Sequence, residues 1–193
     1  MKALNLLASS ILVPIIVSSA FCGYRRTIIE NEIASYQTDL SVQKRGTPLS
    51  RKETIRSLIR LTELYKNISN YEKAFSCAKK AHDLGEKHLS KTSLGYAAVL
   101  SNLADVRFDK KVSNDLAIKL HCRAAGIYEK EKPISAELVG TFIKLGRRYS
   151  FCTPPDLPKM EACLMKASSI LSHLGNKKYD LRFACLVGFA SLS

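Results

Sequence analysis

Six polar side chains recur in this sequence at a spacing of 42 positions and could act together in binding or catalysis. They form two series: Arg60, Asn102 and Lys144, and Glu63, Asp105 and Arg147. Arginine, lysine and amide groups donate hydrogen bonds, so the first series complements the backbone carbonyls and acidic side chains of a peptide. The pattern predicts a surface that binds a protein or peptide of acidic character rather than a catalytic centre.

Motifs of catalysis and metal binding do not occur elsewhere in the sequence. We find no glycine-rich phosphate loop, no HExxH, no GxSxG and no paired CxxC. The four histidines lack metal-ligand spacing, and we expect them at the surface or at a groove edge: His82, His88, His121 and His173. The sequence therefore predicts a protein that is not an enzyme and has no metal or cofactor.

A stretch of alternating aromatic and basic residues, FIKLGRRYSF, leaves a second function open. Such interleaving occurs in platforms that stack nucleic-acid bases, and the formal net charge of +13 favours anionic partners. However, Phe142, Leu145 and Tyr149 share one face of a helix, which favours a core role for them. The alternative to a peptide-binding scaffold is thus a basic helical domain that binds nucleic acid or an anionic membrane surface.

The six polar residues are positioned by a repeated helical pattern that begins with LIRLTELY at residues 58–65. The pattern returns after 42 residues and again after 84, and a weaker version follows near the C-terminus. One position stays small throughout: Thr62, Ala104, Gly146 and Gly188. A fixed period of this length indicates stacked structural units.

Each repeat reads as a pair of helices with recognisable start residues. Capping boxes are predicted at Thr27 with Glu30, at Ser50 with Glu53 and at Ser69 with Glu72. The third pair is expected to start near Ser135, and its second helix at Asp156.

The second helix of each pair carries small residues on one face, as close helix packing requires. They are Ala74, Ala78, Ala81, Ala117, Ala124 and Ala167. A leading helix before the first pair is predicted from the apolar face of Ile29, Ile33, Tyr36 and Leu40. In the last segment, Ala184, Val187 and Gly188 occupy the repeat positions of Leu58, Leu61 and Thr62. Their side chains are smaller than those of the first unit.

Over residues 50–175 these pairs resemble tetratricopeptide repeats, and the 42-residue period with LSNLADV is similar to the repeats of kinesin light chains. The resemblance implies an all-α fold, a right-handed superhelical stack of antiparallel helix pairs over residues 27–193. It also implies a non-enzymatic interaction scaffold whose leading helices line a concave groove for a peptide or partner helix. Arg107 departs from the pattern, because it replaces an aromatic residue, and this predicts looser packing of the second unit.

Residues 1–20 form a separate apolar segment preceding the repeats. Ser18 and Ala20 have the small-residue spacing of a signal-peptidase site, which predicts a secretory, periplasmic or extracellular location. The run is also long enough for a single membrane-spanning anchor, followed by Arg25 and Arg26. Both interpretations remain open at this point.

The six cysteines do not have the pattern of a disulfide framework. Cys77, Cys122 and Cys163 lie beside the small-residue faces of successive helices, which indicates packing roles. Export would expose the thiols to an oxidising compartment, so Cys22, near the mature start, and Cys152, in the third loop, are expected to be the most reactive.

Overall fold

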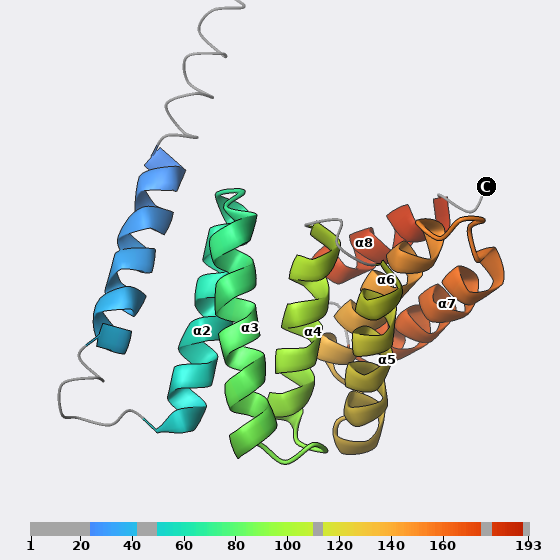
Figure 1. Ribbon diagram of the computed structural model, residues 1–193. Coiled ribbons are helices and arrows are strands. Elements are labelled where there is room, and N and C mark those ends of the chain that lie inside the picture. Colours follow the sequence, from blue (N-terminus) through green and yellow to red (C-terminus); the bar gives the residue numbers. More distant parts are fainter. Residues whose placement is uncertain (1–23, 42–49, 110–113, 175–178, 191–193) are drawn as a thin grey trace, which may run out of the picture.

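The computed structural model describes residues 24–41, 50–109, 114–174 and 179–190, and in these ranges the chain is all-α. A helix at residues 24–41 precedes seven labelled helices (Figure 1). They are α2 (Arg51–Asn67), α3 (Tyr71–His88), α4 (Leu94–Asp109), α5 (Asn114–Glu131), α6 (Ala136–Ser150), α7 (Leu157–His173) and α8 (Tyr179–Ala190).

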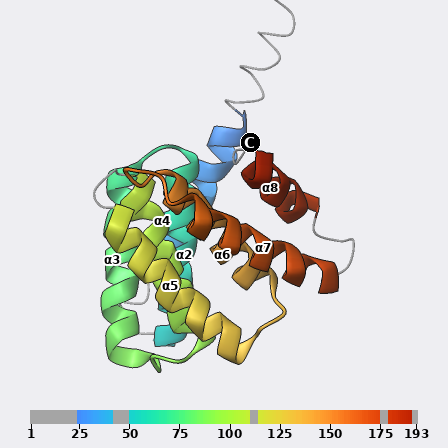
Figure 2. The same ribbon diagram turned by 90° about the vertical axis from the view of Figure 1, so that its right-hand side faces the viewer.

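The helices form a stack of antiparallel pairs, as the repeat predicts. The pairs are α2 with α3, α4 with α5, and α6 with α7, and each second helix also contacts the first helix of the next pair. The stack runs from the helix of residues 24–41 at one end to α8 at the other (Figure 1). At that far end α8 packs on both α6 and α7 (Figure 2).

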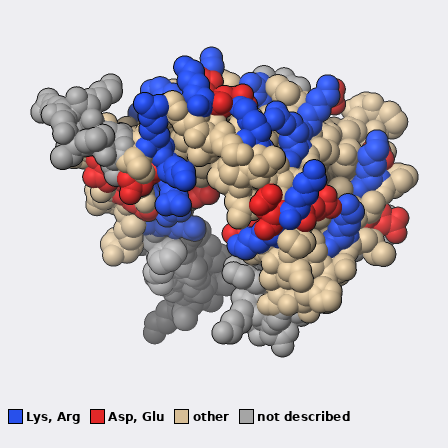
Figure 3. Space-filling view, turned by 90° about the horizontal axis from the view of Figure 1, so that it is seen from below, with Lys and Arg blue, Asp and Glu red and all other residues tan. Residues whose placement is uncertain are grey.

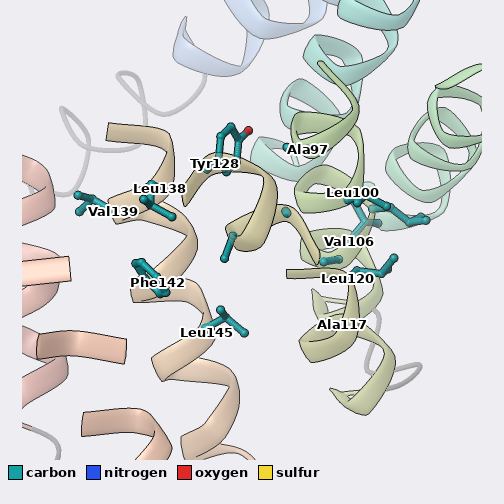
Figure 4. Close-up of a cluster of buried hydrophobic side chains, with 14 of the residues drawn as sticks. Ala97, Leu100, Val106, Ala117, Leu120, Tyr128, Leu138, Val139, Phe142 and Leu145 are labelled. Carbon is teal, nitrogen blue, oxygen red and sulfur yellow. The ribbon is translucent and has the colours of Figure 1, made fainter. Parts of the chain in front are cut away.

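Small side chains let the paired helices approach closely, and larger ones fill the space between pairs. The predicted alanines of the second helices are 0–1% exposed. Between α4, α5 and α6, Leu100, Leu138 and Phe142 belong to one buried cluster (Figure 4). Burying these side chains is the main source of stability, at about 1.5–3 kcal/mol for each large apolar residue.

The leading helix packs on α2 through the predicted face. Ile33 is buried, and Ile29, Tyr36 and Leu40 pack against the core. Gln37 Nε2 donates a hydrogen bond of 2.7 Å to the hydroxyl of Tyr65. The chain is already helical at residue 24, so Thr27 lies inside the helix and does not cap it.

Three of the five predicted helix starts are confirmed, and those at Thr27 and Ser69 are wrong. Ser50 and Glu53 form the capping box of α2, and Ser135 and Asp156 cap α6 and α7 through their side-chain oxygens. The prediction at Ser69 fails because this residue has a φ of 58°, in the left-handed region. Asn70 caps α3 instead, accepting a hydrogen bond from the Lys73 backbone N–H at 3.2 Å.

The prediction of a loosely packed second unit is wrong. Arg107 places its guanidinium 5.4 Å from the ring centre of Phe75, so a cation on α4 faces an aromatic ring on α3. In the same helix Tyr96, Leu100 and Val106 are fully buried. The substitution of Arg107 for an aromatic residue therefore keeps the contact between neighbouring pairs.

Residues 1–20 lie outside the described residues, as does Cys22. Among the helices that the structure describes, none combines the length and the apolar character of a membrane span. The five described cysteines are free thiols, and Cys185 is buried. Cys122 is exposed, in contrast to the packing role predicted for it.

Candidate partner-binding groove

The first helices of the three pairs line a groove of about 480 Å³. One wall comes from α2, the floor from α4, and the other wall from α6. Small side chains line much of it, among them Ala98, Ser101 and Gly140. Because these side chains are short, a bound chain could approach the helix backbones closely.

Four of the six polar residues singled out in the sequence lie in this groove: Glu63, Asn102, Asp105 and Lys144. They come from three different helices separated by up to 81 positions in the chain. The 42-residue register brings them together because equivalent residues of stacked units lie on the same side of the stack.

Arg60 and Arg147 do not line this groove. Arg60 lies beside it, where its guanidinium pairs with Glu32 of the leading helix at 2.9 Å and with Glu63 at 3.2 Å. These contacts raise the pKa of Arg60, chiefly through the hydrogen bond to Glu32. Arg147 is exposed and lines a different cavity, on the side of α6 that faces α8.

Asp105 is the centre of a partly buried charge cluster at the floor of the groove. Its carboxylate lies 2.6 Å from Lys144 Nζ and 3.2 Å from Arg148 Nη2. Burial alone would raise the pKa of Asp105, but the contacts with His121 and Lys144 outweigh it and hold the pKa well below its usual range. Asp105 is therefore ionised in the folded protein and fixes both cations in place.

His121 lies beneath the groove, fully buried, which corrects the prediction of a surface or groove-edge position. Its Nε2 lies 3.2 Å from Asp105 Oδ1. Its Nδ1 is 3.5 Å from Ser101 Oγ. Burial lowers the pKa of His121, and the nearby charges of Lys144 and Arg148 lower it further. The contact with Asp105 raises the pKa but does not outweigh these effects. The imidazole is therefore neutral at pH 7.

Asn102 carries an unused hydrogen-bond acceptor at the groove floor. Asn102 is only 7% exposed. Its Oδ1 has no hydrogen-bond partner among the described residues. A buried polar atom without a partner costs about 1–3 kcal/mol. A ligand that donates a hydrogen bond to Asn102 would remove this cost.

The sequence pattern missed several uncharged residues of the groove. Ala98 and Gly140 have no polar side chain, and Ser101 and Thr141 each align with an apolar residue in another repeat, so a search for recurring polar side chains passes over all four. Helical spacing could have found them, because Ala98 precedes Asn102 by four positions and Gly140 precedes Lys144 by four.

The charged surface does not form a continuous basic stripe on the face seen from below. Acidic side chains lie beside basic ones there (Figure 3). The structure also contains exposed ion pairs, such as Lys132 with Glu137 and Lys166 with Glu129. Within the described ranges, no group of three or more His, Cys, Asp or Glu side chains has the arrangement of a metal site.

Comparisons with known proteins place the fold. No protein-family model matches the sequence, and no curated protein matches it. Among solved structures, BtubC (BKLC) from P. vanneervenii superposes with a TM-score of 0.73 at 16% identity, over 85% of this chain and 65% of that one. The chain thus spans less than two thirds of BtubC.

Two further structures agree with this match. The nearly identical TPR-like repeats of a Podosopora anserina kinesin light chain superpose with a TM-score of 0.66 at 13% identity, over 85% of this chain and 77% of that one. MamA superposes with a TM-score of 0.52 at 18% identity, over 85% and 86% of the two chains. At these identities the likeness concerns the fold alone. The chain therefore has the fold of tetratricopeptide-like repeat proteins, and the structures that it resembles include the TPR-like repeats of a putative kinesin light chain.

Proposed function

We propose that this protein is a non-enzymatic scaffold that binds an extended peptide or a partner helix in the groove between α2, α4 and α6. The observation that carries the proposal is the convergence of Glu63, Asn102, Asp105 and Lys144 on one groove of about 480 Å³. Proteins of this fold typically mediate protein–protein interactions, which supports a protein partner in general.

The floor of the groove suits a peptide backbone. Asn102 offers an amide whose oxygen has no partner in the part of the chain that the structure describes, and the neighbouring short side chains leave room for main-chain atoms. An amide group can accept and donate at once, as a peptide unit does. The groove would thus hold the backbone of a ligand through Asn102, and the walls of the groove would contact the ligand's side chains.

Two cations at the groove can pair with acidic side chains of a ligand, although Glu63, Asp105 and Glu137 also line it. Lys144 keeps 44% of its side-chain exposure although it pairs with Asp105, so a ligand carboxylate can reach it from the open side. Arg60 is equally exposed at the rim. The overall charge of +13 would attract such a ligand over longer distances.

A selected peptide tests the proposal. A random-peptide phage library is screened against the protein, and the dissociation constant of the recovered peptide is measured for the parent and two variants. The double substitution Arg60→Ala with Lys144→Ala should weaken binding at least about tenfold, since charge-assisted hydrogen bonds contribute about 1.5–3 kcal/mol each. The matched control, Lys79→Ala with Lys80→Ala, removes the same charge from exposed positions of α3 and should leave binding unchanged.

Equal weakening by both double variants would show that only net charge matters and would contradict the groove. A salt titration separates the alternative function, because binding to a phosphate backbone falls steeply with salt. Asn102→Ala should weaken the peptide complex without changing its salt dependence.

A further inference from the structure

A second cavity, of about 550 Å³, lies between α6, α7 and α8 at the far end of the stack. Its floor is apolar and buried, with Met160 2% and Leu164 1% exposed. Its rim is open, since Phe151 and Val187 are about half exposed. The cavity is separate from the groove described above, because the two share no lining residue.

The repeat register explains why this space is empty. Ala184 occupies the position that Leu58, Leu100 and Phe142 fill in the first three units. Those three side chains are 0–6% exposed and complete the packing of their units. In the last unit the shorter alanine leaves their volume vacant.

Position 187, one helical turn after Ala184, also carries a smaller side chain than its counterparts in the earlier units. Val187 stands where Leu61, Leu103 and Leu145 are buried in the earlier units. Two large side chains of the repeat are therefore replaced by smaller ones on the face of α8 that lines the cavity.

The cavity does not arise because α8 stands away from its neighbours. A Cβ atom added to Gly188 would lie 2.7 Å from Leu164 Cδ2, so the helix backbone already approaches α7 as closely as a glycine permits. The short side chains of Ala184 and Val187 therefore contribute to the space, while α8 and α7 remain in contact.

The lining defines the chemistry of an occupant. The floor and walls are apolar, and the volume falls within the roughly 300–1,000 Å³ of small-molecule sites. Arg147, an exposed cation, lines the same cavity from α6. An alkyl chain fits the floor, and a carboxylate at its end complements the guanidinium.

We propose that this cavity, built where Ala184 and Val187 replace leucine-sized residues beside Arg147, binds a free fatty acid of medium chain length. The alkyl tail lies on Met160 and Leu164, and the carboxylate pairs with Arg147 at the rim. This site is independent of the peptide groove, so either can fail without the other.

The test measures binding of decanoate and decan-1-ol to the full chain by isothermal titration calorimetry, below the critical micelle concentration. The parent should bind both with saturation, and decanoate more tightly. Ala184→Leu with Val187→Leu restores the residues of the earlier units, and it should abolish binding while raising the melting temperature, because the cavity is filled. A gain in stability also excludes unfolding as the reason for lost binding.

Arg147→Gln should weaken decanoate binding about tenfold and leave decan-1-ol binding unchanged. Ile134→Ser removes an exposed apolar side chain outside the cavity and should affect neither ligand. Absence of saturable binding to the parent, or undiminished binding to the filled double variant, would overturn the proposal. Equal loss of both ligands on Arg147→Gln would overturn the role of the guanidinium.

Discussion

Asp105 shows at the scale of one residue how a groove residue can also hold the fold together. Its carboxylate joins α4 to α5 through His121 and to α6 through Lys144 and Arg148. Arg148 is only 4% exposed, so its charge depends on Asp105 for compensation. A residue that the sequence suggests for binding is thus part of a structural charge cluster as well.

Replacement of Asp105 is therefore expected to destabilise the protein. Asp105→Ala leaves the buried guanidinium of Arg148 without its carboxylate, which should lower the free energy of unfolding by about 3 kcal/mol. Urea denaturation followed by circular dichroism measures this change. Glu137→Ala breaks the exposed pair with Lys132 and should cost less than about 1 kcal/mol. Similar losses in the two variants would mean that the cluster does not stabilise the fold.

The same cluster predicts how stability depends on pH. Burial lowers the pKa of His121 below its ordinary 6.5, so below that pH the unfolded chain binds a proton that the folded chain does not. The stability linked to His121 is therefore fully present above pH 6.5. It falls as the pH drops, by at most about 1.4 kcal/mol per pH unit. The depressed pKa of Asp105 adds a further loss in more acidic solution.

His121→Gln provides the comparison. Glutamine stays neutral and can still donate to Asp105, so the slope of the free energy of unfolding between pH 6.5 and pH 5 should become smaller. The measurement is urea denaturation at several pH values for both proteins. An unchanged slope would show that other groups cause the pH dependence.

At the scale of the elements, each first helix divides its residues between two tasks. On α2, Leu61 is 2% exposed and packs in the core, whereas the adjacent Arg60 is exposed at the groove rim. The helical period of 3.6 residues sets this division, because neighbouring positions point about 100° apart. Stability and binding can therefore be changed separately on one helix.

Two neighbouring substitutions test this separation. Leu61→Ala should lower the free energy of unfolding by about 2–5 kcal/mol, because it leaves a cavity between helices. Arg60→Ala should lower it by no more than about 1 kcal/mol, since its ion pairs with Glu32 and Glu63 are exposed. Thermal unfolding of both variants gives the comparison, and equal effects would contradict the assignment of Leu61 to the core.

At the scale of the whole molecule, the apolar run of residues 1–20 carries a prediction about location. We propose that this segment directs the protein to a membrane, for export or for anchoring. After fractionation of the native cells, the protein should be recovered from the membrane or from an exported fraction. N-terminal sequencing then distinguishes cleavage after Ala20 from retention of the segment. Full-length protein found in the cytosol alone would contradict the proposal.

Spacing along the sequence was enough to predict the helix pairs and their order. The 42-residue period predicted α2 to α7, and their small residues predicted which faces approach closely, because both depend on local spacing along a helix. It also named Glu63, Asn102, Asp105 and Lys144, which share the groove. Periodicity suffices for these features because equivalent positions in stacked units have equivalent surroundings.

How the charged residues pair, and where space remains between helices, depends on contacts between units. Repeat spacing treats Asp105 and Arg147 as equivalent, yet Asp105 is held in a charge cluster while Arg147 lines another cavity. The difference arises because α4 has a helix pair on either side, whereas α6 has the unusual α8 as one neighbour. Likewise, His121 is buried because α4 and α6 cover it, and no local pattern in the sequence reports such contacts between units.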